Sequence, residues 1–345
     1  MPTHILLVGN PTAQTGRAAA RIDAALSAMR ARGWDARLLP TEPEGRTVAA
    51  VAGAVDEGPW EIVVYLGGDG TFAEVAKGLL RASRVVPMGM LPSGTANNQG
   101  RSFGVSADPE ALQANLEVIE AGNITRLDVG QVEKVDEHGE VLGRELFFDS
   151  IGWGFQADVL EQRNRDREVV GRIPLLRELY RDQAVYAGAA LNRYLSSWVE
   201  PTVFDAEVET RGALHRYTRL TDLIINGTPV YAGDWVLDRR SEPDDGRMEL
   251  VPVKGRRELL TKAVLDFRRS PLWREHIDAI GAFHSDGYSA DAFDVRLSRP
   301  GKYDIPCQID GEEWLGGDSF KVRVLANRLP LLTPPEFVPP WRESS

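Results

Sequence analysis

The stretch Val63–Glu74 reads VVYLGGDGTFAE and decides the fold. An apolar run of the kind found in buried strands leads into the glycine-rich segment Gly67–Gly70, and a helical pattern starts immediately after it. Glycines let a backbone approach a ligand closely, and the N-terminus of the next helix offers unpaired N–H groups at the positive end of its dipole. The stretch therefore predicts an anion site where a strand ends, although a tight turn capped by Asp69 or Thr71 has the same pattern.

The segments around this loop alternate between strand and helix through the first 125 residues or so. The strands are predicted at Ile5–Val8, Ala36–Leu39, Ile62–Leu66 and Val85–Leu91. The helices are predicted at about Arg17–Arg32, Thr47–Val55 and Phe72–Arg81, with a last one between Asp108-Pro109 and Gly122. Continuous apolar strands that alternate with helices indicate a doubly wound parallel sheet covered on both faces. We therefore predict one α/β domain over residues 1–125.

After about Arg126 the pattern changes to short strand-like segments. These lie at Val129–Val135, Glu145–Ile151, Val203–Glu209, Leu220–Asn226, Glu249–Val253, Asp294–Leu297 and Lys321–Leu325. Asp136–Gly139 predicts a hairpin turn, and helical patterns interrupt the strands at Leu175–Trp198 and Glu258–Phe267. We predict an antiparallel β-sandwich over residues 126–327. The tail over residues 328–345 is rich in proline and is predicted to form an extended strap on the first domain.

The composition excludes several classes of protein. The 345 residues carry a net charge of -11, which argues against nucleic-acid binding because that needs a basic surface. Cys307 is the only cysteine, so no internal disulfide can form and a reducing cytoplasm is expected. The N-terminus has no signal-peptide pattern, and no apolar run reaches the ~18 residues of a membrane-spanning helix.

A second loop of small and polar residues follows another apolar strand. Leu91–Asn98 reads LPSGTANN and comes directly after Val85–Leu91. Two such loops at the carboxyl ends of two strands in one parallel sheet can enclose a nucleotide between them. Neither the P-loop pattern nor the Gly-x-Gly-x-x-Gly fingerprint occurs, and the protein-kinase signatures are also missing.

The loops Gly67–Thr71 and Leu91–Asn97, with Asp310–Glu312 far downstream, resemble the diacylglycerol kinase catalytic-domain superfamily. The likeness is strongest to its soluble bacterial diacylglycerol and lipid kinases, in a group that also contains the sphingosine and ceramide kinases. The resemblance implies an NAD kinase-like first domain and a lipid-binding β domain. It also implies transfer of the γ-phosphate of MgATP to the hydroxyl of a lipid such as diacylglycerol or a sphingoid lipid.

The resemblance also implies roles for single residues. The expected ATP contacts are Asn10, Thr41, Gly67, Gly68, Asp69, Gly70, Thr71, Glu74, Ser93, Gly94, Thr95 and Asn97. Asp69 is expected near the phosphates, where it would help to organise Mg²⁺. Glu312 resembles the general base that removes the proton from the lipid hydroxyl, with Asp310 as a further catalytic candidate. Asp245 matches a carboxylate that holds a structural or regulatory Mg²⁺, with backbone carbonyls near Glu242 and Arg247 alongside.

Some of these features have other readings. Asp-Gly is the commonest hairpin signal, so Asp310–Glu312 and Asp244–Gly246 also read as plain turns. Ala73 stands where the family usually has asparagine, and Asn98 stands where it usually has aspartate. The loss of an amide at position 73 removes hydrogen bonds worth ~0.5–1.5 kcal/mol each, so weaker nucleotide binding is expected.

Two alternative functions stay open. NAD kinases share the Gly-Gly-Asp-Gly-Thr loop, so the substrate could be soluble. Because Ala73 and Asn98 differ from the residues usual in the family, the protein could also be a nucleotide- or lipid-binding module without catalysis. A lipid kinase would act in lipid metabolism, including phospholipid biosynthesis. It would be cytoplasmic and would touch the membrane only peripherally and transiently. We also expect a homodimer, because members of the group often form dimers. The basic stretch Lys254–Arg274 reads either as a membrane-surface helix or as a solvated helix face.

Overall fold

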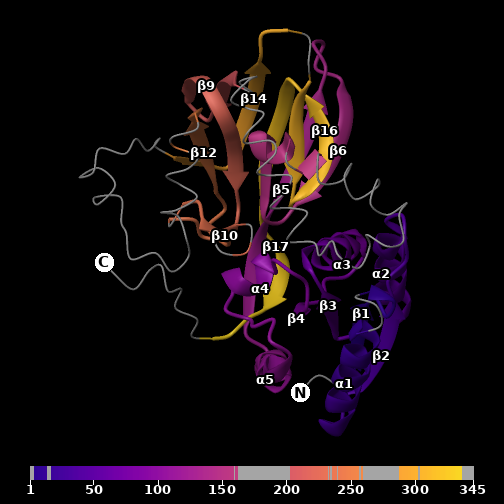
Figure 1. Cartoon of the computed structure of the whole chain (residues 1–345). Helices are drawn as coiled ribbons and strands as arrows, with labels where there is room; N and C mark the ends of the chain where they lie inside the picture. Colours follow the sequence, from indigo (N-terminus) through magenta and orange to yellow (C-terminus); the bar gives the residue numbers. More distant parts are fainter. Residues whose placement is uncertain are drawn as a thin grey trace, which may run out of the picture. The chain divides into compact units, whose positions relative to one another are not determined.

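We describe a computed structural model of the chain, shown in Figure 1. The structure describes residues 4–13, 17–158, 160–161, 203–231, 233, 235–238, 240–255, 258, 287–301 and 304–335. The chain forms two compact units. Unit 1 contains residues 1–129, 228–246 and 325–345, and unit 2 contains residues 130–227 and 247–324. The boundary falls within two long strands, β5 (Ile124–Val135) and β17 (Ser319–Leu332).

Unit 1 is built on a parallel sheet in the order β2-β1-β3-β4. The strands are β1 (His4–Gly9), β2 (Asp35–Pro40), β3 (Ile62–Gly67) and β4 (Met88–Pro92). Their residues are almost entirely buried in β1, β3 and β4, as expected for a sheet covered on both faces. The last part of β17 joins β4 in parallel, with Leu331 opposite Met88.

Helices cover both faces of this sheet. They are α1 (Arg17–Ala31), α2 (Arg46–Glu57), α3 (Asp69–Arg81) and α5 (Leu112–Ala121), the last preceded by a 3-10 turn, η2 (Pro109–Ala111). Apolar residues of α1 and α5 share one core cluster with Val64 and Leu66 of β3. Tyr65 points to the opposite face, where its ring meets Phe72 of α3 edge-on at 5.4 Å. This arrangement confirms the predicted doubly wound α/β fold.

Shorter elements complete unit 1. They are the helix α4 (Asn98–Ser102) and the two-stranded hairpin β10 (Val230–Tyr231) and β11 (Trp235–Val236). The hairpin is attached to α4, because the Val230 N–H donates to Ser102 Oγ at 3.1 Å. Residues 228–246 belong to unit 1, whereas the sequence pattern assigned them to the second domain.

Unit 2 is antiparallel. Its remaining strands are β6 (Val141–Phe147), β7 (Ser150–Gly154), β8 (Phe204–Thr210), β9 (Ala213–Asn226), β12 (Met248–Lys254), β13 (Tyr288–Ala290), β14 (Ala292–Ser298), β15 (Ile305–Ile309) and β16 (Glu312–Gly317). Side chains of nearly all these strands meet in one core, in which the rings of Trp153 and Phe320 lie 5.1 Å apart. The strand-rich second unit agrees with the predicted antiparallel β domain.

Several local predictions need correction. The predicted strand at Glu145–Ile151 is the end of β6 and the start of β7, because the chain turns at Phe148-Asp149 between them. The predicted strap begins with the end of β17, where Leu331 lies opposite Met88 of β4 in unit 1. The predicted helix at Leu175–Trp198 and nearly all of the predicted helix at Glu258–Phe267 lie outside the described residues, as does most of the basic stretch Lys254–Arg274. Within the described part of the chain, no helix is long and apolar enough to cross a membrane.

Candidate active site

The ends of four parallel strands bring several predicted site residues to one edge of unit 1. Asn10 follows β1, Thr41 follows β2, Gly67 ends β3 and Ser93 follows β4. Hydrogen bonds link these ends, since the Thr41 N–H donates to the Gly9 carbonyl at 3.0 Å and the Ser93 N–H donates to the Gly67 carbonyl at 2.7 Å. Ligands of open parallel sheets bind at this edge, which makes it the candidate site of unit 1.

The two small-residue loops touch through their glycines. A Cβ on Gly94 would lie 2.5 Å from the Cα of Gly68, and a Cβ on Gly68 would lie 3.2 Å from the Cα of Gly94. No other residue fits at Gly94 without moving the backbone. A Cβ on Gly70, in contrast, would have no neighbour within 4 Å, so this glycine leaves the approach to the loop open. The contact joins the two loops into one polar backbone surface.

The N-terminus of α3 lies on this surface. Gly68 is the N-cap residue, and no side chain caps the helix. Because the first amides of a helix have no partners within it, the first turn of α3 presents N–H donors and a positive dipole end. Thr71 and Glu74 follow within the next turn and are partly buried, as is Ala73 at the position where an asparagine was expected. This end of α3 can therefore hold an anion such as a phosphate group.

Asp69 connects the first loop to the second. Its carboxylate accepts hydrogen bonds from the backbone N–H groups of Asn97, Asn98 and Gln99, the last at 3.4 Å. Burial raises the pKa of Asp69 above its ordinary value, and the three amides lower it in part. These contacts give Asp69 a positioning role, because it fixes the start of α4 beside α3. Its predicted part in organising Mg²⁺ stays a prediction.

Asn97 shapes the second loop from within. It has a positive φ of 52°, and its side chain makes two hydrogen bonds with Gly94. Asn97 Oδ1 accepts from the Gly94 N–H and Asn97 Nδ2 donates to the Gly94 carbonyl, both at 2.7 Å. Thr95 is left exposed at the tip of the loop. Thr95 is thus the loop side chain most open to a ligand, whereas the Asn97 amide is occupied in closing the loop.

Asn98 stands where the family usually has aspartate, and its contacts show why asparagine is accepted here. Its Oδ1 accepts a hydrogen bond from the N–H of Gly233, which lies between β10 and β11, at 2.7 Å. This contact requires an acceptor oxygen, which both asparagine and the aspartate usual in the family provide. Asn98 is buried, and a neutral amide is cheaper to bury than a carboxylate.

In unit 2, Asp310 and Glu312 have different surroundings. Asp310 and Gly311 both have positive φ, 50° and 79°, and form the tight turn between β15 and β16. The Asp310 carboxylate accepts hydrogen bonds from the N–H groups of Phe148, Asp149 and Ser150 at 2.8–3.1 Å. Glu312 opens β16 and is exposed. The geometry therefore makes Asp310 a structural acceptor and leaves Glu312 as the accessible carboxylate of the motif.

The predicted metal residues lie on the turn before β12. Glu242 and Asp245 are exposed in unit 1, while Arg247 starts the second segment of unit 2 and its guanidinium donates to Ser289 Oγ at 2.9 Å. Asp128, which the sequence analysis did not select as a metal ligand, accepts from the Gly246 N–H at 2.5 Å and the Asn327 N–H at 2.6 Å.

The charge at this turn suits a cation. Burial raises the pKa of Asp128, its two backbone hydrogen bonds lower it, and the charges of Asp245 and Asp244 raise it further. An oxygen-rich turn with surplus negative charge fits Mg²⁺, which binds oxygen ligands and keeps several waters. No cluster of three or more metal-binding side chains occurs among the residues that the structure describes. A Mg²⁺ ion at this turn would therefore need backbone carbonyls and water molecules as ligands in addition to the carboxylates.

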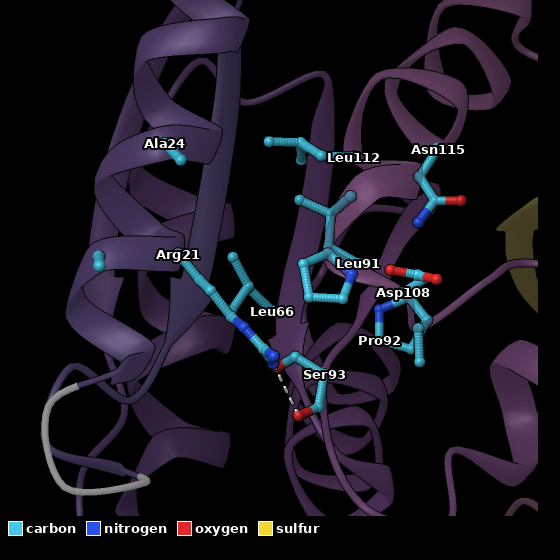
Figure 2. A pocket seen from close by; sticks show the side chains of 12 residues that line it. Arg21, Ala24, Leu66, Leu91, Pro92, Ser93, Asp108, Leu112 and Asn115 are labelled. Atoms are coloured by element: carbon cyan, nitrogen blue, oxygen red, sulfur yellow. Dashed lines mark hydrogen bonds between the residues drawn. The ribbon is translucent and has the colours of Figure 1, made fainter.

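Sequence reasoning missed one residue that supports the second loop. Arg21 of α1 donates a hydrogen bond from Nη1 to the Ser93 carbonyl at 3.2 Å, as Figure 2 shows. The two residues are 72 positions apart, and the helical pattern of α1 gave no sign of this contact.

Comparison with known proteins agrees with this geometry. The family model of the diacylglycerol kinase catalytic domain matches residues 4–132. The predicted resemblance is thereby confirmed. A Pseudomonas fluorescens protein named "Probable lipid kinase YegS-like" is 30% identical over 151 residues, which are 44% of this chain and 46% of that protein. The chain thus matches about half the length of this curated relative.

Solved structures share the fold over nearly the whole chain. A diacylglycerol kinase from Bacillus anthracis superposes with a TM-score of 0.67 at 15% identity, covering 98% of this chain and 99% of that one. A yeast NADH kinase superposes with a TM-score of 0.53 at 11% identity, covering 97% and 84%. At these identities the likeness speaks for the fold alone. It supports the predicted NAD kinase-like architecture.

Proposed function

We propose that the protein is an ATP-dependent lipid kinase, which transfers the γ-phosphate of MgATP to a hydroxyl group of a lipid such as diacylglycerol or a sphingoid lipid. The observation that carries the proposal is the contact of the two glycine loops at Gly68 and Gly94, beside the uncapped N-terminus of α3. This contact lies within the residues matched by the diacylglycerol kinase catalytic domain.

In this proposal the chain positions the phosphates and neutralises their charge. Phosphoryl transfer requires mainly these two effects. The amides of α3 and of the Gly67–Thr71 loop bind phosphate oxygens, and Gly70 lets the nucleotide come close to the backbone. Asp69 and Asn97 keep the second loop in place through their backbone contacts. Asn10, Thr41 and Thr95 lie at or beside the same strand ends and are proposed to contact the rest of the nucleotide.

Glu312 is proposed as the general base. Its exposed carboxylate takes the proton from the lipid hydroxyl as that oxygen bonds to the γ-phosphorus and ADP leaves with the bridging oxygen. Mg²⁺ would supply charge neutralisation at the phosphates when bound. Asp245 and Asp128 are proposed to hold a separate, structural cation at the turn before β12.

A transfer assay tests the function. Purified protein is incubated with Mg²⁺, γ-labelled ATP and mixed micelles that contain diacylglycerol, sphingosine or ceramide, and in parallel with NAD. We expect label in at least one lipid and none in NADP. Label in NADP alone would move the assignment to a soluble substrate, and nucleotide binding without any transfer would make the protein a non-catalytic module.

The role of Glu312 is tested by Glu312→Gln. Loss of the base should lower turnover by ~10²–10⁴-fold, while nucleotide affinity and thermal stability stay as in the wild type. Glu313→Gln is the matched control, because Glu313 is also exposed and is the next residue of β16. Wild-type turnover in Glu312→Gln would contradict the assignment.

We further propose that the enzyme meets its lipid at a membrane surface by peripheral, transient contact from the cytoplasm. This follows from the chemistry of the substrate and not from any described surface. A homodimer is proposed on the same family grounds, and light scattering of the purified protein measures it directly.

A further inference from the structure

A pocket of about 230 Å³ lies on the α1–α5 side of the unit 1 sheet. It sits where β3 and β4 end, and Figure 2 shows α1 on one side and α5 on the other. Most of its lining is apolar and includes Leu66, Leu91, Pro92 and Leu112. Because α1 contributes alanines here, Ala24 among them, the helix leaves this space open.

One cation lines this pocket without an ion pair. Arg21 makes its hydrogen bond to the Ser93 carbonyl, and it takes part in none of the ion pairs among the described residues. A guanidinium has five N–H donors, so several remain for a ligand. Among the described residues, the lining also contains one carboxylate, Asp108, which is exposed and accepts from the Glu110 N–H at 3.1 Å. Figure 2 places Asp108 on the far side of the pocket from Arg21.

The chemistry of the lining defines a class of ligand. An arginine that makes no ion pair with the described residues favours an anionic group on one wall, and the leucines favour an apolar body. A cavity of about 150 Å³ admits benzene, so this larger pocket suits an acid of about eight carbons. We infer that the pocket binds a small amphiphile with one anionic group, such as a medium-chain carboxylate, with the anion on Arg21 and the chain between α1 and α5.

The position of Arg21 couples this pocket to the second glycine loop. A carboxylate bound by the remaining donors draws the guanidinium toward the pocket and lengthens its hydrogen bond to the Ser93 carbonyl, so ligand binding loosens the support of the loop. The predicted effect on nucleotide affinity rests on the proposed function, whereas binding of the acid does not. Since coupling between two sites is reciprocal, nucleotide should weaken the binding of the acid by the same factor.

The first test measures binding of octanoate by calorimetry in the absence of nucleotide, with 1-octanol as the uncharged match. We expect saturable binding of one octanoate per chain and much weaker binding of octanol. Arg21→Gln should weaken octanoate binding about tenfold or more, because it removes a charge-assisted hydrogen bond. Ala24→Leu should abolish binding by filling the pocket, and Ala49→Leu at an exposed site on α2 is its control. No octanoate binding, or equal binding by Ala24→Leu, would overturn the inference.

The second test titrates a non-hydrolysable ATP analogue with and without saturating octanoate. We expect octanoate to weaken nucleotide binding about fivefold in the wild type and to have no effect in Ala24→Leu. Complete competition, or loss of nucleotide binding in Ala24→Leu, would mean that the pocket belongs to the nucleotide site and would overturn a separate site. Thermal melting of each variant confirms that it is folded.

Discussion

Asp310 holds the backbone amides of Phe148, Asp149 and Ser150, which lie about 160 positions earlier in the chain. Asp310→Ala removes this acceptor, and hydrogen bonds to charged groups are worth ~1.5–3 kcal/mol each. We expect the variant to lower the free energy of unfolding by at least ~2 kcal/mol, measured by urea denaturation. Asp310→Asn should cost less, because asparagine tolerates the positive φ and can still accept. Equal stability of Asp310→Ala and the wild type would argue against a structural role.

Asp222 of β9 is a second carboxyl group, and its surroundings make the stability of the fold depend on pH. It is buried, its Oδ1 accepts from the Gln156 N–H at 2.8 Å, and its Oδ2 has no hydrogen-bond partner among the described residues. Burial raises the pKa of Asp222 well above its ordinary value, the Gln156 amide lowers it, and the charge of Asp158 raises it. The folded state therefore binds this proton more tightly than the unfolded state.

The sign of the pH effect follows from this difference. Stability contributed by Asp222 is complete below its unfolded pKa of about 4 and is lost as the pH rises toward the folded value. Asp222→Asn keeps an acceptor for Gln156 and removes the titration. We expect its Tm to exceed that of the wild type at neutral pH and to fall less between about pH 5 and about pH 8. Asp23→Asn on the exposed face of α1 is the control, and identical pH profiles for all three proteins would contradict the prediction.

At the scale of elements, the contact between the two glycine loops can be tested with a pair of matched substitutions. Gly94→Ala places a Cβ 2.5 Å from Gly68, so the loops must separate. We expect a loss of ~1–3 kcal/mol in stability and weaker nucleotide binding, measured by urea denaturation and calorimetry. Gly70→Ala adds the same methyl group to open space in α3 and should stabilise the fold by ~0.5–1 kcal/mol. If Gly94→Ala has the stability and nucleotide affinity of the wild type, the two loops can move apart without cost, which would contradict the prediction.

Elements set by local chemistry could be predicted from the sequence. Asp108 caps η2 with Pro109 at its first position, and Gly122 ends α5 with a φ of 70°, as the residue types indicated. The same reasoning could not assign Asp310, whose partners are fixed only by the pairing of β15 with β7. It also could not see Arg21 beside Ser93, since contacts between distant segments depend on packing and leave no local pattern.

For the whole molecule, the division into units depends on segments far apart in the chain. The first 129 residues are completed by residues 228–246 and by the end of β17. Asn98 and Ser102 hold the β10–β11 hairpin, and Thr333 pairs with Asn123 through an N–H to carbonyl bond of 3.0 Å. A boundary near residue 125 with residues 328–345 returning to the first domain, as the sequence pattern predicted, therefore misses residues 228–246 of unit 1.

This arrangement predicts that the part matched by the family model is not a folding unit. A fragment of residues 1–132 would lack the β17 partner of β4 and the hairpin on α4, and so would expose a buried strand edge. We expect the fragment to aggregate or to melt without a cooperative transition, whereas the full chain melts cooperatively. Circular dichroism with thermal melting and light scattering measures both. A monomeric fragment with a cooperative melt near that of the full chain would mean that residues 228–246 and 325–335 add little to unit 1, and that the catalytic domain is a unit of folding as well as of sequence.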